Sequence, residues 1–360
     1  MSTEPLLAPL PLALEEIDRD WVARALRTRA PDAGLLGMEI LDIFHGTCTR
    51  VKMRLDLDEA GRRAGIVDTV ILKGGFEPHS RMLPHMHEAE VRAYRDVIPQ
   101  LGLRSPACYF VEFDADCAQG IVILEDLTKR GVTLCHPLTP HTPDQVARRL
   151  SDLAAFHAKT WNSPEFKPGG RWSHLDVVNE GKHLEEYLEP AIWQSFLDLP
   201  RGRATSIRFQ DRHWMLEALE RLRMLAARLP QAVIHGDTHL GNLYIEPDGS
   251  PGFFDSVTHR WSPIGEITYH LACALDPIDR RASESDLVRH YLDELARHGV
   301  DAPSHAETMQ NYATFLAFGF CIFMVNAAAW QPEAINTAYT ARFSMAMIDN
   351  DTIGALDAIG

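Results

Sequence analysis

Two acidic residues and an amide in the second half of the chain have the types and order needed for phosphoryl transfer. Asp237 and Asn242 lie in the segment IHGDTHLGNL, and Asp255 ends the apolar segment GFFD. A carboxylate beside a substrate hydroxyl can orient it and accept its proton. An amide oxygen and a second carboxylate suit Mg²⁺, which also takes phosphate oxygens and water. We therefore predict that Asp237 is the catalytic base and that Asn242 and Asp255 are metal ligands.

The segment between Asn242 and Asp255 is expected to form a hairpin. Leu243 to Glu246 and Gly252 to Asp255 are strand-like, and a Pro-Asp-Gly turn separates them. A chain that runs out and returns brings the two predicted metal ligands near each other. An Asp N-cap or turn beside a hairpin is the alternative for Asp237 and Asn242 alone. The His-Gly before them and the Asp after them together favour the functional interpretation.

Residues 1–125 have the pattern of a small sheet with one inserted helix. Apolar and charged residues alternate strictly through Val51 to Leu57, which predicts a half-buried strand. Further expected elements are a helix at Glu15 to Ala30, a turn at Gly61 to Gly65, a strand at Val67 to Lys73, a helix at Pro84 to Ile98, and strands at Ala107 to Glu112 and Gly120 to Leu124.

Residues 126–360 are predominantly helical in pattern. Thr142-Pro143 is a good helix start, and helical periodicity continues through Leu184 to Leu197 and Arg212 to Leu229. Met309 to Pro332 contains no charged residue and has the length of a membrane span. Polar residues interrupt it, however, and no Lys or Arg flanks it closely. We expect a buried helix rather than a membrane span.

Length, charge and cysteine content fit a cytoplasmic enzyme. The chain has 360 residues, enough for two or three domains or one two-lobed enzyme, and a net charge of −15. This charge argues against nucleic-acid partners, because phosphate binding needs a basic face. The six cysteines are scattered without a Cys-x-x-Cys pair, which favours reduced thiols. The acidic N-terminus lacks the basic start of a signal peptide, so we expect a cytoplasmic location.

The segment HGDxHxxN with its following Asp resembles the aminoglycoside phosphotransferase and choline kinase superfamily. Ile123 to Leu127 (ILEDL) and Phe156 to Trp161 (FHAKTW) are most similar to its ecdysteroid-kinase-like branch. The resemblance implies an α+β, two-lobed, protein-kinase-like fold that uses ATP and Mg²⁺. Residues 1–125 would form the nucleotide-binding sheet lobe. Residues 126–360 would form the helical lobe with the catalytic loop, the metal site and the acceptor-binding helices.

The same resemblance assigns roles to two charged residues in the first lobe. Lys73 ends the apolar strand, where the family places a Lys that contacts the α- and β-phosphates. Glu90 lies on the next predicted helix, where the family has a Glu that pairs with this Lys. A surface Lys at a strand end and a solvated helix charge are the alternatives.

Two segments correspond to the family's nucleotide-covering loop and hinge. Gly46, Thr47 and Thr49 precede the strand that begins near Val51. This segment has one Gly and matches neither common phosphate-loop motif, so hydroxyls and backbone N–H groups would have to reach the phosphates. Glu125 and Leu127 lie at the hinge, where main-chain groups would bind adenine.

The chain also departs from the family pattern. Ser256 follows Asp255, where relatives often have an aromatic residue, and His270 occupies the position of an Asp that supports the fold. His235 and His239 flank the predicted base. We expect them to brace the loop; a transition-metal site or a metal-dependent hydrolase formed with Asp237 is the alternative, although no third ligand has a recognisable spacing.

The acceptor is expected to be a small molecule with a hydroxyl group. The apolar helix near Phe315 to Val325, with Trp330, favours a partly apolar acceptor such as a steroid-like alcohol or a hydroxyacyl compound. A cationic acceptor of the aminoglycoside or choline type, or a non-catalytic nucleotide-binding pseudokinase, are the alternatives. Carboxylates that would serve a cationic acceptor follow the predicted metal site: Asp276, Asp279, Glu284 and Asp286.

Overall fold

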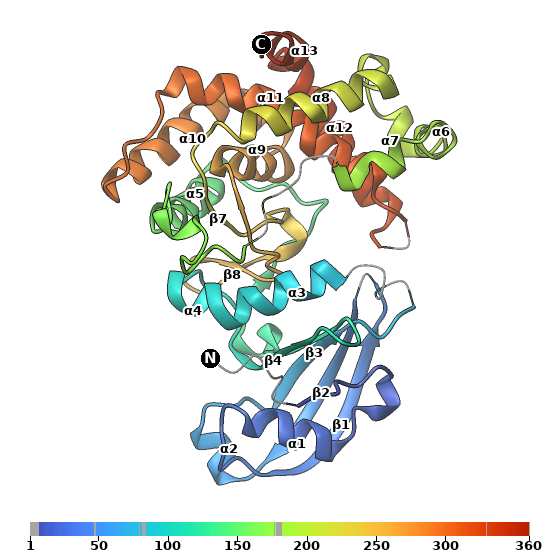
Figure 1. The fold of residues 1–360 in the computed structure, drawn as a ribbon, viewed down its shortest axis with the longest axis vertical. Coiled ribbons are helices and arrows are strands. Elements are labelled where there is room, and N and C mark those ends of the chain that lie inside the picture. The colour runs from blue at the N-terminus through green and yellow to red at the C-terminus, as the bar shows by residue number, and fades with distance from the viewer. Residues whose placement is uncertain are drawn as a thin grey trace. The chain divides into compact units, whose positions relative to one another are not determined.

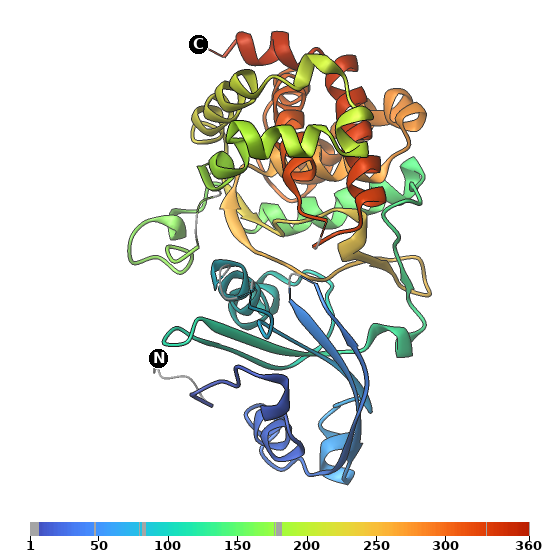
Figure 2. The same ribbon diagram turned by 90° about the vertical axis from the view of Figure 1, so that its right-hand side faces the viewer.

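The computed structural model describes residues 7–46, 48–78, 80, 84–175, 177, 182–328 and 330–359. The chain divides into two compact units, which Figures 1 and 2 show from two sides. The first, here called the sheet unit, comprises Met1–Thr133 and Tyr244–Val257; the second, the helical unit, comprises Leu134–Leu243 and Thr258–Gly360. The predicted α+β class is confirmed, with an antiparallel sheet at the N-terminus and a mainly helical C-terminal part.

The sheet unit contains a five-stranded antiparallel sheet in the order β1-β2-β3-β5-β4. Its strands are β1 (Leu35–Phe44), β2 (Thr49–Leu57), β3 (Thr69–Gly74), β4 (Cys108–Asp114) and β5 (Gln119–Glu125). Burial alternates along β2, as the period-two pattern predicted, because successive side chains point to opposite faces. Where a turn was predicted at Gly61 to Gly65, Asp58 caps a short helix, α2 (Glu59–Arg63), and the turn follows only at residues 64–65.

Helices cover both faces of this sheet. On one face, α1 (Arg19–Arg27) places Trp21 edge-on against Phe110, with ring centroids 5.5 Å apart. On the other, α3 (Pro84–Arg92) continues through a π-helical turn (Ala93–Val97) into α4 (Ile98–Leu101), and Tyr94 packs on Val122. Lys73 therefore ends a strand that is buried between two apolar layers.

The helical unit is built around α9 (Pro263–Ala274), all of whose residues are buried. The helices that pack against it include α5 (Pro143–Ala158), α11 (His305–Val325) and α12 (Glu333–Asp349). The rest are α6 (Pro190–Leu197), α7 (Pro200–Arg203), α8 (Arg212–Ala226), α10 (Pro277–Arg297) and α13 (Thr352–Asp357). A small antiparallel pair, β7 (Ala232–Ile234) and β10 (His259–Trp261), flanks the loop that contains Asp237.

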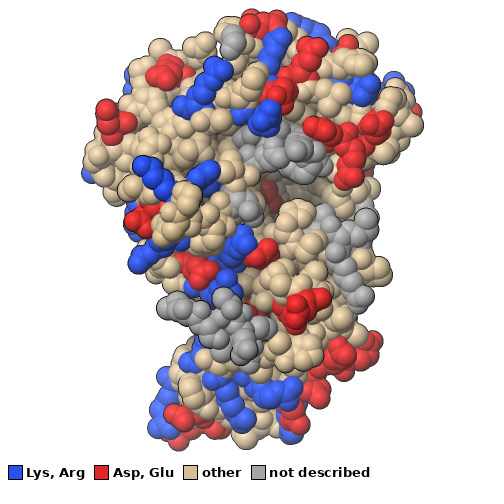
Figure 3. Space-filling model, in the orientation of Figure 1, with Lys and Arg blue, Asp and Glu red and all other residues tan. Residues whose placement is uncertain are grey.

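The predicted hairpin forms β8 (Leu243–Ile245) and β9 (Pro251–Phe253), which are neighbouring strands. The apolar segment near Phe315 is α11, the one helix among the described residues that is long and apolar enough to cross a membrane. Of its most apolar window, 78% is buried, as in the core helix of a folded unit, so a membrane span is not supported. Figure 3 shows Lys and Arg interspersed with Asp and Glu on one face of the molecule.

Candidate functional site

In the sheet unit, Lys73 forms ion pairs with both of the acidic residues that the sequence assigned to this region. Its Nζ lies 2.9 Å from Glu90 Oε1 on α3 and 3.1 Å from Asp255 Oδ1 after β9. Burial alone would lower the pKa of Lys73, but the carboxylates of Asp255 and Glu90 outweigh it and raise that pKa above its usual value. Lys73 is therefore a fixed cation between two carboxylates, in the position predicted for a phosphate contact.

Asp255 has a left-handed backbone conformation, with φ of 53°. Such a conformation costs a residue with a side chain about 1 kcal/mol, although Asp tolerates it better than most. It occurs two residues after the end of β9, where the carboxylate meets Lys73. The next residue, Ser256, is buried, and its hydroxyl makes no hydrogen bond within the described part of the chain. A small polar side chain thus lies where the resemblance led us to expect an aromatic one.

The predicted nucleotide-covering loop lies between β1 and β2. Thr47 lies outside the described residues. Gly46 forms the bend, and a Cβ there would meet no atom closer than 3.7 Å, so the bend does not require Gly for space. The buried Thr49 hydroxyl donates to Glu77 at 3.2 Å. Of the predicted loop residues, Thr49 is thus engaged in holding the loop.

Sequence reasoning missed a contact between this loop and α3. Cys48 Sγ lies 3.5 Å from His87 Nδ1, while His87 Nε2 lies 3.1 Å from the Ser80 carbonyl oxygen. The carbonyl can only accept, so Nε2 carries the proton and Nδ1 accepts from the thiol. Burial is the main cause that raises the pKa of Cys48 to about 12, so it is a neutral thiol.

At the predicted hinge, the side chain and the main chain of Glu125 are both engaged. Its carboxylate accepts from Arg130 at 3.1 Å, and its N–H joins the sheet. The Asp126 N–H donates to the Thr69 carbonyl at 3.2 Å. The Leu127 N–H, by contrast, makes no hydrogen bond to any residue that the structure describes. Leu127 therefore offers a main-chain donor of the kind predicted for adenine.

In the helical unit, three side chains meet the Asp237 carboxylate, which is one-third exposed. Tyr269 donates its hydroxyl to Oδ1 at 3.0 Å, and Asn242 Nδ2 donates to Oδ2 at 2.8 Å. His239 Nε2 lies 3.5 Å from Oδ2. Burial raises the pKa of Asp237, but His239, His235 and the Tyr269 hydroxyl together lower it below the usual value. The predicted base is therefore ionised and held from two sides.

Asn242 fits the predicted role of a metal ligand. Its amide nitrogen donates to the Asp237 main-chain oxygen at 3.0 Å as well as to the carboxylate. Both amide hydrogens are thus used, which leaves the amide oxygen without a partner among the described residues. An amide oxygen here and the Asp255 carboxylate in the sheet unit are ligand types that suit Mg²⁺.

The two histidines of the loop act as braces. His235 Nδ1 accepts from the Asp237 N–H at 3.2 Å, and His239 Nδ1 accepts from the Gly241 N–H at 2.9 Å. Each ring therefore has an unprotonated Nδ1 that is already occupied. Among the described residues, no group of three His, Cys, Asp or Glu side chains could hold a metal ion. The geometry favours the structural interpretation over a transition-metal hydrolase.

One face of α9 contacts four consecutive residues of this loop. Glu266 accepts from the N–H groups of His235 and Gly236 at 3.1 and 2.7 Å, and Tyr269 bonds to the next residue, Asp237. His270 lies 2.9 Å from the carbonyl oxygen of the fourth, Thr238. Glu266, Tyr269 and His270 have the spacing i, i+3, i+4, which is one helix face. His270, in place of the family's Asp, still supports the loop.

The carboxylates considered for a cationic acceptor are largely structural. Glu284 forms an ion pair with Arg280 at 2.6 Å, and Asp276 caps the first turn of α10. Asp279 and Asp286 lie on the exposed face of α10. None of the four therefore has the geometry of a preformed cation site.

The end of α11 contributes aromatic residues beside the loop. Phe323 stacks on Tyr269 with ring centroids 5.5 Å apart and an interplanar angle of 13°. Its ring centroid also lies 4.3 Å from that of Tyr339 and 6.1 Å from that of His239. Phe323 is buried, so it supports Tyr269 as core, while Trp330 beyond the helix is half-buried.

Comparison with known proteins agrees with this geometry. A model of the ecdysteroid kinase-like family matches residues 41–301. This chain belongs to that family. No curated protein sequence matches it.

Among solved structures, an aminoglycoside phosphotransferase in complex with GDP and kanamycin matches 93% of this chain and 99% of its own, with 11% identity and a TM-score of 0.53. An amicoumacin kinase in complex with AMP-PNP, Ca²⁺ and Ami matches 87% of this chain and 88% of its own, with 15% identity and a TM-score of 0.50. These likenesses show that this member of the ecdysteroid kinase-like family has the fold of the small-molecule phosphotransferases.

Proposed function

We propose that this protein is a kinase that transfers the γ-phosphate of ATP to a hydroxyl group of a partly apolar small molecule. The observation that carries the proposal is the Asp237 carboxylate, ionised and held by Tyr269 and Asn242 beside an unused amide oxygen. The Lys73 cluster of the sheet unit supports it, because it supplies a cation for phosphate and the second predicted metal ligand, Asp255.

In this reaction the acceptor oxygen bonds to the γ-phosphorus while the bond between that phosphorus and the β–γ bridging oxygen of ATP breaks. The hydroxyl proton passes to Asp237, and ADP is the leaving product. Mg²⁺, when bound, would neutralise phosphate charge through ligands such as Asn242 and Asp255. We place the adenine at the hinge, where the Leu127 N–H can donate to a ring nitrogen.

Several observations favour a partly apolar acceptor over a cationic one. Glu284 and Asp276 are engaged within the helical unit, and Glu333 is paired with Arg201. A polycationic acceptor would need carboxylates that are free to pair with it, and Glu284 and Glu333 are already paired with arginines. Trp330, which follows α11 in the chain, is half-buried and adds a partly exposed aromatic side chain. A steroid-like alcohol or a hydroxyacyl compound fits these side chains.

The test measures ATP consumption across a panel of hydroxyl compounds, both neutral and cationic, with and without Mg²⁺. We expect turnover with a neutral acceptor and a loss of about 10²–10⁴-fold in Asp237→Asn, because the proton acceptor is removed. Equal turnover by Asp237→Asn and the parent would disprove the role of Asp237. Mg-ATP binding, seen as a thermal shift, without any phosphorylated product would favour the pseudokinase alternative.

A further inference from the structure

The two oxygens of the Asp237 carboxylate differ in how many donors they already receive. Oδ2 accepts from Asn242 Nδ2 at 2.8 Å and faces His239 Nε2 at 3.5 Å. Oδ1 accepts only from the Tyr269 hydroxyl, at 3.0 Å, among the described residues. A carboxylate oxygen offers two lone pairs in the plane of the group. Oδ2 therefore faces two donors, whereas Oδ1 faces one and has an acceptor direction left.

We propose that Tyr269 is a positioning residue that orients the carboxylate of Asp237 so that Oδ1 receives the acceptor hydroxyl. This inference rests on the function proposed above, in which Asp237 accepts the acceptor's proton. With Oδ2 fixed by Asn242 and Oδ1 by Tyr269, rotation of the carboxylate about its Cβ–Cγ bond would break both hydrogen bonds. The acceptor hydroxyl thus docks beside the tyrosine hydroxyl, on the remaining lone pair of Oδ1.

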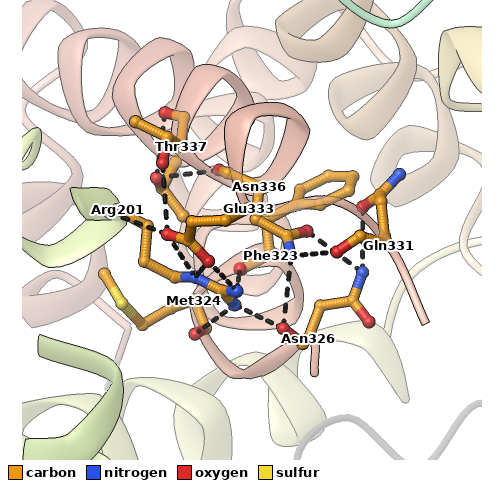
Figure 4. A network of polar contacts seen from close by, with 9 residues as sticks. Arg201, Phe323, Met324, Asn326, Gln331, Glu333, Asn336 and Thr337 are labelled. Atoms are coloured by element: carbon orange, nitrogen blue, oxygen red, sulfur yellow. Dashed lines mark hydrogen bonds and ion pairs between the residues drawn. The ribbon is translucent and has the colours of Figure 1, made fainter. Parts of the chain in front are cut away.

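The Tyr269 hydroxyl can hold an orientation because its ring is fixed from both sides. Tyr269 belongs to α9, which is buried along its whole length, and its ring stacks on Phe323 at the end of α11. That end is itself held by Arg201, whose guanidinium donates to the Phe323 and Met324 carbonyl oxygens at 3.1 Å each (Figure 4). The position of the hydroxyl therefore depends on helices α9 and α11 rather than on the loop.

The experiment compares Tyr269→Phe with the parent, using the acceptor found in the panel and saturating Mg-ATP. Phe keeps the ring and hence the stacking on Phe323, so the variant folds, which its melting curve verifies. We expect kcat to fall about tenfold, since a hydrogen bond to a charged group is lost. The loss should fall on kcat, while KM for ATP and KM for the acceptor stay unchanged, because the hydroxyl orients the base for the chemical step.

Tyr339→Phe is the matched control, because its ring belongs to the same aromatic cluster but its hydroxyl does not bond to Asp237. Parent-like kinetics in this control, with a lowered kcat at unchanged KM in Tyr269→Phe, supports the proposal. Parent-like values in Tyr269→Phe, with Asp237→Asn inactive, would overturn it and leave the proposed function intact. Equal losses of kcat in both tyrosine variants would also overturn it, since they would reflect packing alone. Full activity of Asp237→Asn would instead reject the proposed function.

Discussion

Lys73 is expected to contribute both to stability and to ATP binding, and one substitution can measure the two contributions separately. It balances the buried carboxylate of Glu90 and the half-buried carboxylate of Asp255, and it is the predicted phosphate contact. In Lys73→Met we expect the free energy of unfolding to fall by about 3 kcal/mol, because a buried and a half-buried carboxylate lose their cation. We also expect KM for ATP to rise at least about tenfold, because a charge-assisted contact is lost. Chemical denaturation and initial rates measure these two changes.

Arg54→Met is the control for Lys73→Met. Arg54 pairs with Glu39 at 2.8 Å on the same sheet, but both side chains are 60% exposed. Exposed pairs contribute little, so neither stability nor KM should change appreciably. An unchanged KM in Lys73→Met would contradict the assigned phosphate contact, whatever happens to stability.

At the residue scale, the sequence predicted the candidate reacting residues better than the residues that hold them in place. Lys73, Glu90 and Asp255 converge as their order suggested, and Asp237 meets Asn242. Motifs make such residues recognisable because the reaction restricts their types. Residues that orient them carry no such restriction: Tyr269, Cys48 and His87 were not assigned roles. The spacing of Tyr269 with Glu266 and His270 was the one available signal, since it marks a single helix face.

Among the elements, the junction between α11 and α12 depends on one buried arginine. Arg201 of α7 pairs with Glu333 at the start of α12 and donates to carbonyl oxygens at the end of α11 (Figure 4). In Arg201→Leu we expect a loss of about 3 kcal/mol in unfolding free energy, because the helix carbonyls lose their donor and Glu333 its partner. Chemical denaturation gives this value.

Arg203→Leu is the matched control for Arg201→Leu, since Arg203 lies on the same short helix with its side chain 78% exposed. Its pairing with Asp198, at 3.8 Å, should contribute less than about 1 kcal/mol. Similar losses in the two variants would show that helix propensity, and not the buried network, explains the effect.

The start of α5 gives a separate prediction. The Thr142 side chain accepts from the Gln145 N–H, and the Thr142 N–H donates to the Gln145 side-chain oxygen. Thr142→Ala should lower the free energy of unfolding by about 1 kcal/mol. Thr142→Ser should retain most of the stabilisation that the cap provides. Thermal denaturation distinguishes the two. A neutral Thr142→Ala would mean that solvent replaces the cap at no cost.

Elements with a strong local signal were predictable, and those defined by tertiary contacts were not. The alternation in Val51 to Leu57 and the Thr-Pro start of α5 both gave the observed element. The helix α2 was missed ahead of the turn at residues 64–65, because Gly61 hides a cap supplied by Asp58. Strand β1 was not singled out, since its burial does not alternate and its pairing with β2 contains two irregularities.

For the whole molecule, two buried histidines predict an acid-sensitive fold. Burial, followed by Arg149, lowers the pKa of His270 to about 3 and that of His141 to about 4. Below pH of about 6.5 the unfolded chain binds protons at these positions and the folded chain does not. Stability should therefore fall as pH decreases from about 6.5 towards 4, by about 1 kcal/mol per histidine and pH unit. Denaturation midpoints across this range measure the slope.

His270→Gln isolates one of these contributions. An amide can still donate to the Thr238 carbonyl oxygen, but it does not titrate, so the slope should become shallower. His213→Gln is the control, since His213 is exposed on α8 and should leave the slope unchanged. An identical slope in His270→Gln and the parent would assign the acid sensitivity to other groups.

The contacts made by Glu266, Tyr269 and His270 also limit where this protein can tolerate an insertion or a deletion. Inserting or deleting one residue between β10 and Glu266 would turn the helix face by about 100° relative to the loop, since a helix has 3.6 residues per turn. All three contacts would be lost together, whereas a change after His270 would spare them. We therefore expect natural insertions and deletions near this loop to occur after α9 and almost never before it.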